Sequence, residues 1–177
     1  MPKPQESSRP SLPSGASARR FWLLKSEPET FSFDDLLAAP RKRTGWSGVR
    51  NHQAKLYLRD QMQVGDGILF YHSSAKPPGV AGVARVARAG YPDPTQFDRR
   101  SEHHDPRSRA SEPTWFQVDV AAVAAMKRFV PLEALRARAE LRGMLLLQRG
   151  QRLSVMPVAP GEWKTILALG GLDPERT

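Results

Sequence analysis

The most informative stretch of the chain runs Gly45-Trp46-Ser47-Gly48-Val49-Arg50-Asn51-His52-Gln53-Ala54-Lys55. Glycines flank its tryptophan, so we expect the ring on a flexible turn, where burial of both ring faces is hard to arrange. The four polar side chains that follow carry guanidinium, amide and imidazole groups, which are suited to planar hydrogen-bonding recognition. An aromatic face beside such groups is what a pocket for a flat heteroaromatic ring requires. The stretch therefore points to a nucleobase as the ligand.

Short apolar runs and turns alternate on both sides of this stretch. Their patterns predict strands over residues 21–25, 68–73, 79–86, 115–124 and 153–158. They predict short helices over residues 33–38, 53–59, 140–147 and 160–169, and one that begins at Pro131. Ser32 and Asn51 are expected to cap the first two helices, whereas residues 41–43 and 90–113 are expected to be loops. Without βαβ regularity, this order favours an α+β fold or a partly open barrel over a doubly wound sheet.

The composition is that of one soluble globular domain with an excess of basic residues. The 177 residues are 40% hydrophobic and 25% charged, which is enough apolar material for a core. The formal net charge of +9 favours a polyanionic partner, and nucleic acid is the first candidate. A basic, solvated surface with no such partner explains the charge equally well when the charge is considered alone.

Several classes of protein are excluded or disfavoured. The chain has no cysteine, so it forms no disulfides and no thiolate zinc site. No apolar run approaches the ~20 residues that a membrane-spanning helix needs, and we expect no membrane partner. Residues 1–20 lack the hydrophobic segment of a secretory signal and are rich in proline and serine. We therefore expect a disordered basic extension over residues 1–20, a single domain over residues 21–172 and a cytoplasmic protein.

Two strand ends carry candidate binding groups. Lys25 and Ser26 end the first strand, and strand ends are ordinary positions for ligand contacts, although a solvated lysine and a turn serine are the simpler explanation. In the strand over residues 68–73, alternation places Tyr71 and Ser73 on one face and His72 on the other. One face should enter the core and the other could reach a pocket; side chains satisfied at a sheet edge are the alternative.

No catalytic or metal pattern stands out. The pair His103 and His104 precedes Asp105, but neighbouring histidines usually point apart and no third histidine is near, so we expect no metal site. Nucleophile elbows, metalloprotease helices and phosphate-cradling glycine loops are absent. A Ser–His–Asp set built around His72 is conceivable, but no spacing favours it.

Several short segments keep the order of one known family: residues 22–28, 46–54, 65–66, 70–73, 79–82, 91–95, 115, 118–120, 151–155 and 163. Through these segments the chain resembles the EVE-domain family over about residues 21–170. The resemblance implies a PUA-like fold, in which a curved mixed sheet forms a pseudo-barrel with short peripheral helices. It also implies a non-catalytic nucleic-acid-binding module without a cofactor. The expected ligand is a C5-modified cytosine, 5-methyl or 5-hydroxymethyl, in DNA.

The resemblance also implies a base pocket. Transferred by position, its residues are Lys25, Ser26, Trp46, Val49, Arg50, Asn51, Tyr71, His72, Ser73, Leu153 and Ser154. From their side-chain chemistry, Trp46 would stack on or wall the flipped base, and Asn51 and Ser26 would read its polar edge. The phosphate contacts would come from Lys25, Arg50 and Arg152.

The chain departs from the family pattern at two positions. Ser47 stands where relatives often carry aspartate, and His52 stands where they often carry tyrosine, so ligand choice could differ. Two alternative functions stay open. One is an RNA-binding PUA-like module. The other, less favoured, is a small nucleic-acid hydrolase that uses His72. The sequence does not identify a possible effector protein.

Overall fold

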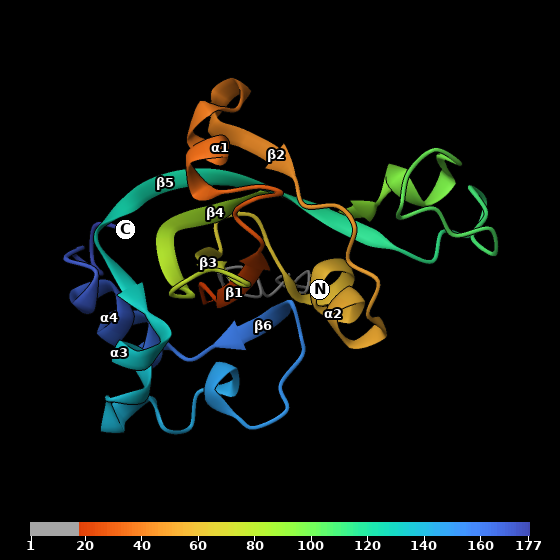
Figure 1. Cartoon of the computed structure of the whole chain (residues 1–177). Helices are drawn as coiled ribbons and strands as arrows, with labels where there is room; N and C mark the ends of the chain where they lie inside the picture. The colour runs from red at the N-terminus through yellow and green to blue at the C-terminus, as the bar shows by residue number, and fades with distance from the viewer. Residues whose placement is uncertain (1–17) are drawn as a thin grey trace, which may run out of the picture.

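One six-stranded mixed sheet organises residues 18–177, which the computed structural model describes (Figure 1). The strands are β1 Phe21–Ser26, β2 Arg43–Gly45, β3 Gly67–His72, β4 Gly79–Pro92, β5 Phe116–Pro131 and β6 Val155–Val158. Their order in the sheet is β2-β5-β4-β3-β1-β6. Only β1 and β3 pair in parallel. The predicted α+β fold with a curved mixed sheet is confirmed.

The helices are short and lie around the sheet (Figure 1). They are α1 Phe33–Ala38, α2 His52–Leu56, α3 Leu132–Arg136 and α4 Pro160–Leu169. Ser32 caps α1 and Asn51 caps α2, each through a side-chain oxygen that accepts a backbone N–H, so both predicted caps are confirmed. The helix predicted over residues 140–147 is wrong: two 3₁₀ turns replace it, with extended backbone at Met144 between them.

Two other predictions from the strand pattern are corrected. β4 and β5 run further than the alternation suggested, because bulges along their pairing shift the register and so interrupt the period of two. The predicted basic loop over residues 41–43 contains the start of β2, where Arg43 pairs with Ala121 of β5. A three-residue edge strand is too short to produce an apolar alternation, so the sequence gives no sign of it.

Both faces of the sheet are packed, which decides where its side chains point. The first core cluster contains Trp22, Phe70 and Val118 and is covered by residues of α1 and α2. The second cluster contains Leu69 and Tyr71 with residues of α3 and α4. Side chains therefore alternate along β3 as predicted. Because both faces of the sheet are covered, the Tyr71 side chain is buried in the second cluster and does not reach a pocket.

The two edge strands, β2 and β6, stay unpaired with each other, so the barrel has an opening between them. Of the predicted extension over residues 1–20, positions 1–17 lie outside the described residues. Arg19 Nε donates to the Gly65 carbonyl and the Arg20 N–H donates to Asp66, so these two residues contact the domain. No helix within residues 18–177 is both long and apolar enough to cross a membrane.

Candidate functional site

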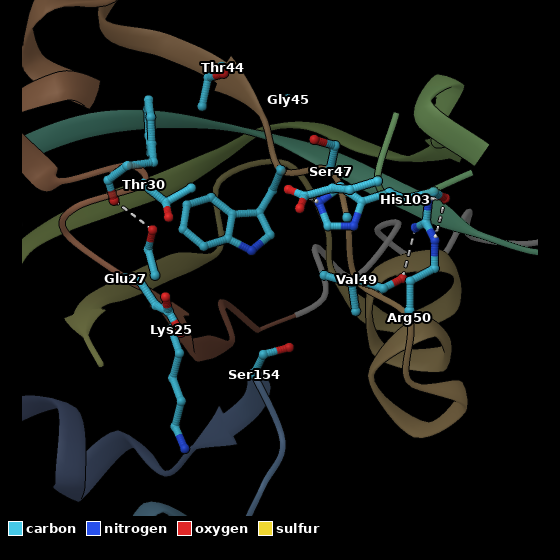
Figure 2. A pocket seen from close by; sticks show the side chains of 15 residues that line it. Lys25, Glu27, Thr30, Thr44, Gly45, Ser47, Val49, Arg50, His103 and Ser154 are labelled. Carbon is cyan, nitrogen blue, oxygen red and sulfur yellow. Dashed lines mark hydrogen bonds and ion pairs between the residues drawn. The ribbon is translucent and has the colours of Figure 1, made fainter. Parts of the chain in front are cut away.

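A cavity of about 560 Å³ lies at the opening between the two edge strands (Figure 2). Its walls come from the ends of β1 and β2, the segment between β1 and α1, the loop over residues 46–50, the excursion over residues 93–115 between β4 and β5, and the residue before β6. This volume is in the range of sites that hold small molecules. Six of the predicted pocket residues line it: Lys25, Ser26, Trp46, Val49, Arg50 and Ser154.

The other predicted pocket residues do not line the cavity. Asn51 is exposed, and its Oδ1 accepts the Ala54 N–H at 2.9 Å as the cap of α2. Tyr71 is 4% exposed in the second core cluster, on the opposite face of the sheet. Burial also raises the pKa of its phenol.

The last three residues of the predicted set lie near the cavity or beside the core. The Ser73 N–H donates to the Ser26 carbonyl at 2.9 Å and so extends the pairing of β1 and β3. Leu153 packs against both core clusters. His72 Nε2 accepts the Phe33 N–H at 3.1 Å, which needs a neutral ring, and burial lowers the pKa of this imidazole. Arg152, predicted to contact phosphate, is exposed and does not line the cavity.

The surroundings of Trp46 differ from the flexible turn that the sequence predicted. The Trp46 side chain packs edge-to-face on Phe70, with ring centroids 5.4 Å apart and an interplanar angle of 89°. The backbone N–H of Trp46 donates to the Val118 carbonyl at 2.8 Å, which anchors the start of the loop to β5. The residue is only 8% exposed, so the expectation that burial of both ring faces is hard to arrange is wrong. Trp46 forms a wall of the cavity from within the core.

Asp93 holds the loop in place. Its carboxylate is fully buried and accepts the Gly48 N–H at 2.8 Å, Arg50 Nη1 at 2.9 Å, and both the N–H and the hydroxyl of Thr95. Burial alone would raise the pKa of this carboxyl group. The hydrogen bonds from Thr95, Gly48 and Arg50 outweigh burial and hold the pKa below its usual value. Asp93 is thus an anion at neutral pH.

Arg50 uses all of its donors inside the protein. Nε and Nη2 donate to the His103 carbonyl at 3.0 and 2.7 Å, and the other N–H groups reach Asp93, Thr95 and the Val49 carbonyl. These are the five N–H groups that a guanidinium has. The guanidinium also lies 5.4 Å from the Trp115 ring. Arg50 therefore joins the loop to residues 93–103, and its predicted phosphate contact stays a prediction.

The sequence did not single out Asp93 and Thr95, and it considered His103 only as a metal ligand. The sole signal for the first two was their place in a segment of family resemblance. Glu102 and His103 line the cavity, and His103 Nε2 lies 3.5 Å from the Glu102 carboxylate (Figure 2). Within residues 18–177, no group of three or more acidic or histidine side chains could hold a metal ion.

Gly48 has a backbone that only glycine adopts readily, with φ of 83°, and the His103 ring packs directly against it. Replacing Gly48 by alanine is expected to destabilise the protein by more than replacing Gly150. Both positions have positive φ and share a cost of about 1 kcal/mol. Only at Gly48 would the new Cβ meet another group, His103 Nε2 at 2.6 Å. Urea unfolding measures the difference; equal losses would mean that His103 moves aside freely.

Lys25 gives the cavity a cation without an ion-pair partner. Among the residues that the structure describes, no carboxylate lies within 4.0 Å of its ammonium group. Burial lowers the pKa of this amine. Its side chain extends past Ser154 at one side of the cavity, while Thr44 and Ser47 lie on the other side (Figure 2). The cavity thus combines aromatic walls, hydroxyl groups and one available cation.

The two departures from the family pattern have different surroundings. Ser47 is exposed and lines the cavity, so it lies where a ligand would be read. His52 lies outside it, with its ring centroid 4.9 Å from that of Trp115. Of the two, only Ser47 is placed to affect ligand choice by direct contact.

A curved mixed sheet with a cavity at the opening between its edge strands defines a small PUA-like domain. The EVE domain family model matches residues 20–169, and the chain belongs to this family.

Relatives and solved structures agree with this assignment. Thymocyte nuclear protein 1 from Homo sapiens is 41% identical over 170 residues, which cover 86% of this chain and 75% of the relative. A crystal structure of human THYN1 protein, in complex with DNA that contains 5-methylcytosine, matches with a TM-score of 0.82 and 41% identity over 88% of this chain and 99% of that one. A Pseudomonas putida protein of solved structure is 46% identical, with a TM-score of 0.81 over 85% of this chain and 99% of that one.

Proposed function

We propose that this protein is a non-catalytic reader of a modified base in DNA, and that its ligand is a C5-modified cytosine. The cavity between β2 and β6 is the observation that carries the proposal, because it joins space large enough for a base, aromatic walls and a lysine without an ion-pair partner among the described residues. The THYN1 complex with 5-methylcytosine DNA supports the choice of ligand, since that protein shares 41% of its residues with this chain. A cytoplasmic location is part of the proposal and rests on the sequence alone.

A base that enters the cavity must leave the DNA stack, which costs a few kcal/mol. Contact with Trp46 and hydrogen bonds to the base edge must offset this cost. Thr44, Ser47 and Ser154 bring hydroxyl groups that donate or accept at a polar edge. Lys25 is the cation available for a flanking phosphate, so affinity falls as salt concentration rises.

The 5-methyl group finds apolar walls in Phe31, Trp46 and Val49. Burial of one methyl-sized group contributes about 0.8 kcal/mol, which is roughly a fourfold change in affinity. Discrimination between cytosine and 5-methylcytosine is therefore expected to be several-fold rather than thousand-fold, unless a polar group of the cavity rejects the unmodified base.

The test measures binding to otherwise identical duplexes that carry one cytosine, 5-methylcytosine or 5-hydroxymethylcytosine. The modified duplexes should bind at least about four times more tightly. Replacing Lys25 by methionine should weaken binding to all three. The control is Lys164→Met, which removes an exposed lysine paired with Glu175 outside the cavity.

Equal affinity for the three duplexes would overturn the proposal. The same modifications in single-stranded RNA form a second arm of the experiment, and tighter binding there would replace DNA by RNA as the ligand. A hydrolase would instead consume the labelled strand, and such turnover would have to be lost in His72→Ala.

A further inference from the structure

The outer surface of the β2–β5–β4 end of the sheet is strongly basic. Arg43, Ala121 and Arg85 are direct neighbours across three strands, and Gly45, Asp119 and Arg88 form the next row. Directly paired residues point to the same side of a sheet, and strands lie about 4.8 Å apart. Arg43 and Arg85 thus stand about 10 Å apart on one face. We call this surface the outer basic face; Arg41 and Lys42 directly precede it in the chain.

This face is opposite to the one that builds the cavity. Thr44 lines the cavity, whereas its neighbour Arg43 donates to Asp119 on the outer side. Val118 and Val120, which alternate with Asp119 along β5, belong to the first core cluster. One short edge strand therefore carries a cavity residue on one side and the start of the outer basic face on the other.

The charges on this face are largely uncompensated. Its carboxylate, Asp119, already accepts two N–H groups of Arg43 and the Tyr91 hydroxyl. Arg41, Lys42, Arg85 and Arg88 are exposed, and in the described part of the chain none has a carboxylate within 4.0 Å. The face therefore presents two free cations, Arg85 and Arg88, and the exposed Arg41 and Lys42 precede its edge strand in the chain.

A contact with an aromatic ring also limits how far the Arg88 side chain can move. The Arg88 guanidinium lies 3.7 Å from the centre of the Tyr91 ring, and Tyr91 is itself hydrogen-bonded to Asp119 and Gln117. Arg41 and Lys42 adopt left-handed backbone conformations with φ of 55° and 53°. Such conformations cost about 1 kcal/mol or more per residue and cluster at functional sites.

We propose that the outer basic face is a second nucleic-acid contact, which binds the phosphate backbone of the DNA duplex that flanks the base held in the cavity. This second proposal rests on the proposed function, because that function identifies the duplex. Its charge and its continuity with the cavity through β2 select a polyanion as the occupant. Contacts to phosphate carry no sequence or base information, so this face supplies affinity and the cavity supplies discrimination.

The experiment compares the wild-type protein with an Arg85→Gln, Arg88→Gln double variant. Binding to modified and unmodified duplexes is measured across about 50 to 200 mM salt. Each lost phosphate contact should reduce the slope of log affinity against log salt by about 0.9, and the double variant by about 1.8. Affinity at low salt should fall equally for both duplexes, so their ratio stays unchanged.

The matched control is Arg136→Gln with Arg138→Gln, which removes the same charge from exposed positions at the end of α3. Arg85→Gln alone makes no change to the Tyr91 contact and should show half of the slope effect. An unchanged slope, or an equal change in the control, would overturn the proposal. Equal affinity for the two duplexes in the wild type, with the slope effect intact, would instead reject base reading and leave the outer basic face standing.

Discussion

Asp93→Ala is expected to lower the free energy of unfolding by about 3 kcal/mol and to abolish selective DNA binding. Removing one partner of a buried ion pair costs about 3–5 kcal/mol, because the other charge stays buried without compensation. The lower end applies here, since the Arg50 side chain keeps 22% exposure to solvent. The Gly48 N–H and Thr95 would lose their acceptor at the same time. The loop that lines the cavity would then lose its fixed position.

Urea unfolding measures the loss of stability, and the duplex panel measures binding by the folded variant. Asp98→Ala is the control, because Asp98 lies in the same excursion, with a side chain 50% exposed and paired only with exposed Arg100. It should change stability by less than about 0.5 kcal/mol. If Asp93→Ala matches this control, the hydrogen bonds to Asp93 do not hold the loop.

The same carboxylate should make stability depend on acid pH. The folded protein holds the pKa of Asp93 below its ordinary value of 3.8, so the unfolded chain binds the proton more readily. The stabilisation is fully present above the unfolded pKa and is lost as pH falls through the folded one. Asp93→Asn should lack this part of the acid loss, which thermal unfolding between about pH 5 and pH 2 would reveal as a flatter profile.

The sequence predicted those parts of the fold that depend on interactions between residues close together in the chain. Ser32 and Asn51 were recognised as caps because a short polar side chain before a helix satisfies a free N–H. The strand β2 and the ends of β4 and β5 were missed because bulges and partner strands set them. The partner of Arg43 in β2 is Ala121 in β5, far along the chain, and no periodic pattern carries such information.

The site was predictable in part for a similar reason. Resemblance placed Lys25, Trp46 and Ser154 together, and the cavity contains all three. Side-chain chemistry alone then assigned Arg50 to phosphate, because an arginine on a loop has free donors unless something occupies them. Asp93 and the His103 carbonyl occupy them here, 43 and 53 residues further along the chain. A sequence shows which groups are present but does not show which are already engaged.

Trp46→Phe should separate the two roles of the indole. Trp46→Ala would cost about 3–5 kcal/mol as a buried large-to-small change and would confuse unfolding with lost binding. Phenylalanine keeps an aromatic contact with Phe70 and should cost less, about 1–2 kcal/mol. Stacking on a base contributes about 1–3 kcal/mol. Because only 8% of Trp46 is exposed, the loss of affinity should be near 1 kcal/mol, about fivefold.

Trp163→Phe is the matched control, since Trp163 is 1% exposed in the second core cluster and lies outside the cavity. It should reduce stability to a similar degree without changing affinity for any duplex. Binding is measured by titration at a temperature where both variants are folded. If Trp46→Phe and Trp163→Phe bind the modified duplex equally well, Trp46 is a core residue that the ligand does not touch. If only Trp46→Phe weakens binding, the indole meets the base through the small part of its surface that the core leaves open.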